Sequence, residues 1–310
     1  MSTVTSPASG DETPSRCPPA GSWIAPPCSD ALAPDQLIAA LAERPIVLLG
    51  EQHDDADHHL WQLAVLGALY GRRPDLVLGF EAFPRRVQPV LDRWVAGELG
   101  EAEFLEQTDW KSVWGYDAAL YMPLFRFARM FKVPMVALNV ERAFIRAVGE
   151  NGFAAVPLAA REGIGDPVAP PAAYRDRLTT VYGWKAAIRR GEADYNTPPH
   201  LTAEQKAAIE ADTAFQNFVE AQTAWDRAMA EALAAAHRQP GAPLVVGIVG
   251  RGHVERRWGI PHQLSALGIA EAAVLLAERA PVVCAGLDVD LADAVFILPA
   301  AAAADVSADP

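Results

Sequence analysis

The chain has 310 residues, a formal net charge of −13 and 51% hydrophobic residues, a composition typical of a globular protein with a substantial core. The strong negative charge argues against nucleic acid as a partner, because the mean field of the protein repels phosphate. The three cysteines, Cys17, Cys28 and Cys284, are too few for a disulfide framework, and none belongs to a Cys-x-x-Cys metal motif.

Targeting signals are not evident in the sequence. No stretch reaches the roughly 18 apolar residues that a membrane span requires. Residues 1–16 lack the basic start and the apolar run of a signal peptide. We therefore expect a cytoplasmic location for the chain as written, and a periplasmic or membrane-anchored location if the start codon is misassigned.

Strand-like and helix-like segments alternate along most of the chain. Residues 1–34 are rich in Pro, Ser and Ala and predict a flexible arm, followed by a short helix over 35–42. Apolar runs that end at polar or glycine-containing turns predict strands at 45–49, 76–80, 133–138, 244–249, 273–276 and 295–298. Helical periodicity occupies 57–70, 87–95 and 117–131. This alternation, with continuously apolar strands, predicts an α/β fold with a mostly parallel central sheet covered by helices.

The segment from about 141 to 237 interrupts the alternation. It shows no strand pattern and contains a Pro/Gly-rich stretch at 163–171, followed by an Ala-rich helix from 202 to about 237. We predict a helical insertion between the third and fourth strands, acting as a lid over the site. Residues 35–299 would then form one α/β domain, and residues 300–310 a disordered tail.

Two predicted strands end in the same Gly-x-x-His motif, Gly50 to His53 and Gly250 to His253. A glycine lets the backbone turn sharply where a Cβ would clash. The histidine then lies just beyond the carboxyl end of the strand, where open parallel sheets bind ligands. The second and third strands end in Glu81 and Asn139. Four polar strand ends at one edge of a sheet predict a functional site there.

Two imidazoles and a carboxylate are compatible with three kinds of function. His53, Glu81 and His253 could bind a divalent metal such as Fe, Mn or Zn. Without a metal, Glu81 could orient one histidine as a base toward water, with Glu51 as a further catalytic candidate. The same side chains could also line a pocket that only binds, and either histidine alone could equally cap its turn.

Charged residues near the two histidine motifs have alternative interpretations. His58 and His59 follow Asp54 and Asp55 at one-turn spacing and could share a metal, but such a cluster is more often a solvated helix start. Arg251 could pair with a carboxylate of a ligand, or it could balance nearby acidic residues.

Five segments, in this order, resemble the ChaN-like haem-binding uptake family, which is grouped with the Tiki proteases and the erythromycin esterases. They are Gly50-Glu-Gln-His53, Gly79-Phe-Glu81, Trp114-Gly-Tyr-Asp117, Ala137-Leu-Asn139 and Gly250-Arg-Gly-His253. The resemblance covers roughly residues 45–276. It implies an α/β fold with a helical insertion and a role in haem or iron handling or uptake.

The resemblance also implies how haem would be held. Haem in the family is bound by tyrosine, often at a face shared by two subunits, which implies a homodimer here. Tyr116 and Tyr121 are the candidate ligands, because both lie in the matching segment, and a tyrosinate is a suitable Fe(III) ligand. Trp114, Arg251 and Asn139 are further cofactor-binding candidates.

The hydrolases of the same grouping imply an alternative. In them two histidines and a glutamate carry the reaction, and these roles transfer to His53, Glu81 and His253. We therefore expect a haem- or iron-binding protein with haem or another small molecule as its partner. The alternative is a hydrolase, either an esterase or a metal-dependent peptidase-like enzyme.

Overall fold

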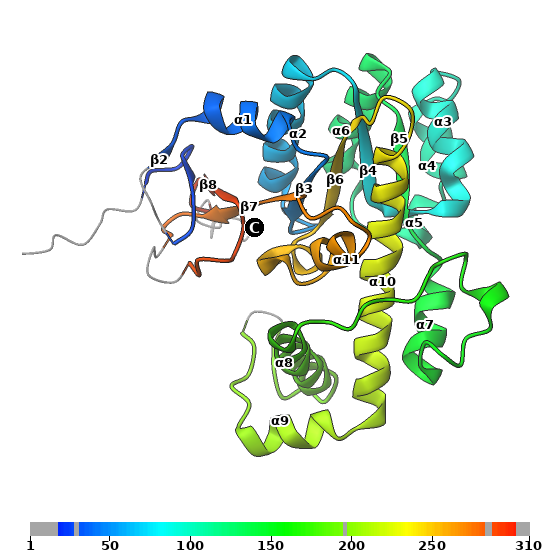
Figure 1. Cartoon of the computed structure of the whole chain (residues 1–310), viewed down its shortest axis with the longest axis vertical. Coiled ribbons are helices and arrows are strands. Elements are labelled where there is room, and N and C mark those ends of the chain that lie inside the picture. Colours follow the sequence, from blue (N-terminus) through cyan, green and yellow to red (C-terminus); the bar gives the residue numbers. More distant parts are fainter. Residues whose placement is uncertain (1–17, 28–30, 195–196, 283–286, 302–310) are drawn as a thin grey trace, which may run out of the picture.

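The computed structural model describes residues 18–27, 31–194, 197–282 and 287–301. Their strands form one eight-stranded sheet in the order β2-β1-β8-β7-β3-β6-β4-β5 (Figure 1). All neighbours from β8 to β5 run parallel, whereas β1 is antiparallel to both β2 and β8. The predicted α/β fold with a mostly parallel sheet is confirmed. The strands are β1 Trp23–Ile24, β2 Ala31–Leu32, β3 Ile46–Glu51, β4 Leu76–Pro84, β5 Met135–Asn139, β6 Leu244–Gly250, β7 Ala273–Arg279 and β8 Ala294–Leu298.

Helices cover both faces of the sheet, because its central strands are apolar on both sides. In β3, Val47 and Leu49 join a core with α1, α2, α3 and α6, whereas Ile46 and Leu48 join a core with α10 and α11. The helices are α1 Pro34–Ala42, α2 Ala56–Arg72, α3 Gln88–Ala96, α4 Glu101–Gln107, α5 Trp110–Val113, α6 Ala118–Phe131, α7 Arg142–Asn151, α8 Ala172–Arg189, α9 Ala203–Glu210, α10 Thr213–His237 and α11 Ile260–Ala266. Short 3₁₀ turns lie at Arg85–Val87, Leu158–Ala160, Arg251–His253 and Glu255–Arg257.

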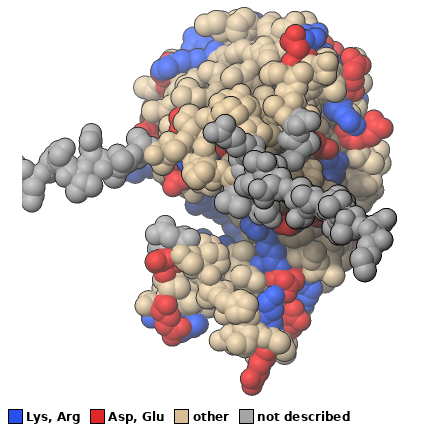
Figure 2. All heavy atoms as spheres, turned by 90° about the vertical axis from the view of Figure 1, so that its left-hand side faces the viewer, with Lys and Arg blue, Asp and Glu red and all other residues tan. Residues whose placement is uncertain are grey.

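The helical insertion comprises α7 to α10 and extends beyond the carboxyl edge of the sheet (Figure 1). Its 25-residue helix α10 packs against β5, β6 and α11 at one end and against α7 and α8 toward the other. The predicted single helix from 202 to 237 is two helices in the structure. The break falls at Asp212, whose carboxylate accepts a hydrogen bond from the Ala214 amide and so begins α10. Figure 2 shows the hollow between the sheet part and the helical part, with basic side chains gathered in it.

The predicted N-terminal arm differs from the structure in its described part. Trp23 and Ile24 form β1, pair with Phe296 and Val295 of β8 and are almost fully buried. Two-residue strands are too short to leave a periodic pattern, so the sequence of this Pro-, Ser- and Ala-rich segment gave no indication of β1. Cys17, Cys28, Cys284 and residues 302–310 lie outside the described residues. Within the described ranges, the helices fall short of the length and apolar character needed to cross a bilayer.

Candidate functional site

The sheet order brings the predicted site strands together. β3 pairs with β6 in parallel, and Glu51 lies opposite Gly250, so the two Gly-x-x-His turns leave neighbouring strands at the same level. β4 and β5 follow on the other side of β6, and β5 ends in Asn139. β4 continues to Pro84, four residues beyond its predicted end, so Glu81 lies within the strand, directly after Phe80, the last residue paired with β6. Gly250 allows the His53 imidazole to approach the end of β6 closely. A Cβ there would lie 2.8 Å from the Cε1 atom of His53 and 3.4 Å from a carboxylate oxygen of Glu81.

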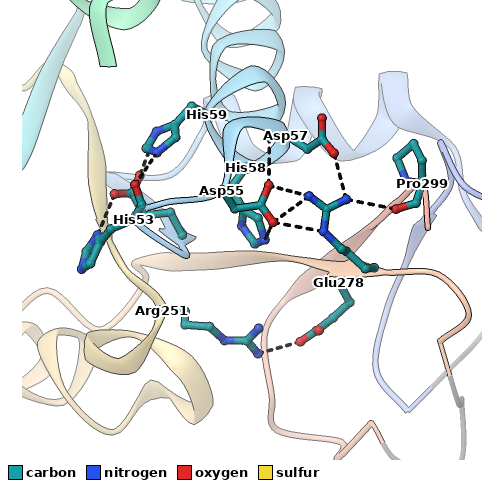
Figure 3. A network of polar contacts seen from close by, with 10 residues as sticks. His53, Asp55, Asp57, His58, His59, Arg251, Glu278 and Pro299 are labelled. Atoms are coloured by element: carbon teal, nitrogen blue, oxygen red, sulfur yellow. Dashed lines mark hydrogen bonds and ion pairs between the residues drawn. The ribbon is translucent and has the colours of Figure 1, made fainter. Parts of the chain in front are cut away.

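Glu51 organises the first histidine turn. One oxygen of its buried carboxylate lies 2.9 Å from His53 Nδ1 and accepts the Tyr121 hydroxyl at 2.5 Å. The other oxygen lies 3.4 Å from His59 Nδ1, so His53 and His59 flank one carboxylate (Figure 3). The side chain of His53 is 24% exposed. Burial disfavours its charged form, but the hydrogen bond to Glu51 and the charge of Glu81 outweigh burial and raise the pKa of His53.

His253 lies between two buried carboxylates. Its Nδ1 atom is 2.6 Å from Asp226 Oδ1, and its Nε2 atom is 3.4 Å from Glu81 Oε1. Glu81 also accepts the Gly250 amide at 2.6 Å, and Asp226 accepts the Tyr174 hydroxyl at 3.1 Å. Burial opposes charge on His253, yet the two carboxylates prevail and raise its pKa to about 10, while the pKa of Glu81 falls to about 2. His253 is therefore an imidazolium at neutral pH.

This pairing bears on the predicted metal set of His53, Glu81 and His253. A metal binds a free imidazole nitrogen, whereas both nitrogens of His253 already face carboxylates, Asp226 at 2.6 Å and Glu81 at 3.4 Å. Across the described residues, no group of three or more His, Cys, Asp or Glu side chains is arranged to hold a metal ion. The geometry therefore does not support the predicted divalent-metal site.

The two candidate tyrosines have different environments. Tyr121 is 1% exposed, and its hydroxyl donates to Glu51, so it acts inside the protein. Tyr116 is 38% exposed, and its ring centroid lies 5.2 Å from that of His53. Trp114 packs edge-on against the same imidazole at 4.7 Å. Partial burial, with the nearby acids Asp54, Glu81 and Glu51, raises the pKa of Tyr116.

Two further cofactor-binding candidates have structural partners. Arg251 is held at 2.6 Å by Glu278 and at 3.4 Å by Glu255, and its side chain turns toward Glu278 (Figure 3). The Asn139 amide donates to the Glu81 carbonyl at 2.9 Å and accepts the Val140 amide. Asn139 thus ties the end of β5 to β4 at Glu81, and Arg251 balances acidic residues.

His58 and His59 are not part of a solvated helix start. Both are almost fully buried, at 2% and 3% exposure. His59 contacts Glu51 and the Tyr121 ring, whose centroid lies 4.3 Å away. His58 lies 3.9 Å from Asp55, the residue that caps α2. Both histidines therefore support the site from within.

Sequence reasoning missed the residues that the insertion contributes. Asp226 and Trp225 lie on α10, and Trp225 packs against His253 with ring centroids 5.1 Å apart. Gly259 leaves room for the Asp226 carboxylate beside His253, because a Cβ at residue 259 would lie 3.0 Å from that carboxylate. One sequence pattern does point to Asp226. Asp226 shares its helix face with apolar residues at one-turn spacing, and a carboxylate in such a stripe needs a buried partner. The other members of the stripe include Phe215, Val219, Met229 and Leu233.

Comparison with known families identifies the group to which this site belongs. A family described as "Haem-binding uptake, Tiki superfamily, ChaN" matches residues 37–264, which is more than half of the chain. The chain belongs to this family. The resemblance noted in the sequence is thereby confirmed. No curated protein matches the sequence.

A solved structure supports the α/β fold of the chain. A structure of ChaN of Campylobacter jejuni, described as showing cofacial heme binding, is 18% identical with a TM-score of 0.63, covering 88% of this chain and 95% of that one. A mutant of the erythromycin esterase EreC in its open conformation is 12% identical with a TM-score of 0.46, covering 81% and 77%. At 18% identity the likeness to ChaN of Campylobacter jejuni concerns the fold alone.

Proposed function

We propose that this protein binds haem at the carboxyl edge of its sheet, with Tyr116 as the ligand of the iron, and that it serves in haem handling or uptake. Membership of the haem-binding uptake family supports haem as the ligand. The related ChaN of Campylobacter jejuni is described as binding heme. The single observation that carries the ligand assignment is the exposure of Tyr116 beside His53, in contrast to the burial of Tyr121.

The residues around Tyr116 fit this role. Bound haem would supply an Fe(III) ion, which prefers an anionic oxygen ligand. The pKa of the Tyr116 phenol is raised, so its proton must leave when the iron binds. His53, held by Glu51 and packed against the Tyr116 ring, is the adjacent group that can pass this proton on to solvent. Trp114 adds an aromatic surface next to both.

The test is a titration of the purified protein with Fe(III) protoporphyrin IX, followed in the Soret region. We expect Tyr116→Phe to lose the tyrosinate-type spectrum and at least about tenfold in affinity, since the ligand atom is gone. Tyr70→Phe is the matched control, because Tyr70 packs against Phe127 and Phe131, with ring contacts as its described interactions. An unchanged spectrum and affinity in Tyr116→Phe would exclude this ligand.

A homodimer forms part of the proposal. Heme binding to the Campylobacter jejuni protein is described as cofacial, and an exposed Tyr116 leaves room for a second copy of this chain to face the first. We expect sedimentation velocity to show dimer formation when one equivalent of haem is added. A monomer at all haem concentrations would contradict this part of the proposal and leave the ligand assignment intact.

A hydrolase is the second candidate, and the Glu51–His53 pair favours it. Tyr121 fixes Glu51, Glu51 orients His53 through Nδ1, and the rest of the His53 imidazole is accessible to a water molecule. His253 cannot act as a base while it is cationic, but its charge could stabilise a developing oxyanion. A screen of esters and peptides, with and without Mn²⁺, Co²⁺ or Zn²⁺, tests this function. Turnover should disappear in His53→Ala and persist in His200→Ala.

A further inference from the structure

A second cavity adjoins the histidine site. It measures about 510 Å³ and lies at the carboxyl ends of β4 and β5, with α5, α7 and α10 around it. Its walls include Trp114 and Trp225. The Trp114 ring also contacts His53, and the Trp225 ring contacts His253, at 4.7 and 5.1 Å between centroids. Two indoles therefore separate this cavity from the two imidazoles, and a flat or elongated ligand could contact both spaces.

The cavity has an excess of positive charge, since three arginines, Arg86, Arg142 and Arg146, face two carboxylates, Asp109 and Glu141. Among its lining residues, Arg86 is neutralised by Glu141 at 2.6 Å and by Asp109 at 3.9 Å. That leaves Arg142 and Arg146, which have no carboxylate partner among the described residues. They lie one turn apart on α7 and both line the cavity. Two unpaired arginines side by side are notable in a chain with a formal net charge of −13.

The cavity at the end of β7, which is also rich in arginine, does not leave such an excess. Figure 2 shows basic side chains in the hollow below the sheet. A cavity of about 400 Å³ at the end of β7 contains four arginines, but each of them is paired with a carboxylate. These pairs are Arg177–Glu255, Arg251–Glu278, Arg256–Asp290 and Arg279–Asp55. An anionic ligand would have to displace these carboxylates, whereas Arg142 and Arg146 are available to it.

We propose that the cavity between Trp114 and Trp225 binds the carboxylate groups of the ligand whose reactive end lies at Tyr116 and His53, with Arg142 and Arg146 as their partners. Guanidinium groups bind carboxylates with two parallel hydrogen bonds, and the indoles contact the apolar body of the ligand. The inference rests on the proposed function, since for haem these groups are the two propionates. Arg142 lies close enough to both parts of the site to act on them, because its charge also partly offsets burial and the nearby acids, which raise the pKa of the Tyr116 phenol.

The experiment compares Fe(III) protoporphyrin IX with its dimethyl ester, which lacks the carboxylates, in one detergent buffer. Wild-type protein should bind the diacid at least about tenfold more tightly than the ester, and this preference should decrease at high salt. The double variant Arg142→Ala/Arg146→Ala should lose the preference and bind the ester as wild type does. Arg142→Lys/Arg146→Lys should regain part of it.

A matched control removes the same charge elsewhere. Arg44 and Arg189 are exposed, have no carboxylate partner among the described residues and do not line the cavity. Arg44→Ala/Arg189→Ala should keep the wild-type preference. If the cavity variant also kept it, the inference would be overturned while haem binding stood. If wild-type protein bound neither porphyrin, the proposed function would fail and the inference with it.

Discussion

His253 is a buried cation between Asp226 and Glu81, and this arrangement makes stability depend on pH. The pKa of His253 is raised from 6.5 to about 10, so its stabilising contribution is complete below pH 6.5 and is lost as the pH rises through 10. The pKa of Glu81 is lowered from 4.5 to about 2, so its contribution is complete above pH 4.5 and is lost as the pH falls through 2.

We therefore expect the free energy of unfolding of the wild type to fall more steeply between pH 7 and 10 than that of His253→Gln. The variant should be less stable at pH 7 by about 3 kcal/mol, because two buried carboxylates lose their counter-charge. Urea denaturation across this pH range measures both effects. Parallel curves for the two proteins would show that His253 is neutral in the fold.

Gly250 sets the distance between the two histidine turns, so a single methyl group there should disturb the site. In Gly250→Ala the new Cβ would lie 2.8 Å from His53 Cε1, and the imidazole must move. We expect haem affinity to fall at least about fivefold while the circular dichroism spectrum is retained. Gly252→Ala is the control, since a Cβ at Gly252 meets nothing within 4 Å. Equal affinity in the two variants would contradict this role of Gly250.

The sequence placed His53, Glu81, Asn139 and His253 at one edge of the sheet because each follows an apolar run, and in three of the four cases a glycine lies two or three residues before. It could not assign Arg251 or Tyr121, since only the fold shows that Glu278 and Glu51 lie beside them. It also could not identify Asp226 as the partner of His253. That contact depends on the rotation of α10 about its axis and on the space left by Gly259.

At the level of elements, Arg279 joins the end of β7 to the start of α2. Its guanidinium contacts Asp55 at 2.6 Å and Asp57 at 2.8 Å, and Asp55 also caps α2 by accepting the Asp57 amide (Figure 3). Arg279→Ala should lower the free energy of unfolding by about 1 kcal/mol, a value reduced for solvent screening because the side chain is 31% exposed. Arg72→Ala, which removes an ion pair to the exposed Asp35, should change stability by less than about 0.5 kcal/mol. Equal losses of unfolding free energy in the two variants would show that the Arg279 connection stabilises the fold no more than an exposed ion pair does.

Helices and strands with a regular spacing of apolar residues could be predicted from the sequence, whereas elements that depend on tertiary contacts could not. The central strands and the helices α2, α3 and α6 lie within one to four residues of where apolar periodicity placed them, and the largest differences are the extensions of β4 to Pro84 and of β7 to Arg279. Short strands such as β1 owe their existence to pairing with β8, and composition does not encode that pairing. The four-residue helix α5 is likewise defined by the packing of Trp110 against Phe83 and Tyr121.

For the whole molecule, the site is assembled from distant parts of the chain, and this couples ligand binding to global stability. β3, β4, β6, α10 and the turn after α5 each contribute a residue near the two imidazoles, so unfolding of any of them removes the site. A ligand that binds only the folded chain stabilises it by about 2.7 kcal/mol at a concentration of 100 times Kd. For a chain of this size we expect haem at that concentration to raise Tm by roughly 5–10 °C.

Calorimetry with increasing haem measures this shift, and Tyr116→Phe should show little of it. The dependence on pH follows from the same phenol. Because iron displaces the raised-pKa proton of Tyr116, the haem-induced shift should grow from pH 6 to pH 8. A Soret band that saturates without any rise in Tm would mean that haem adheres to a surface outside the cooperative fold, and the edge where His53, His253 and Tyr116 converge would not be its site.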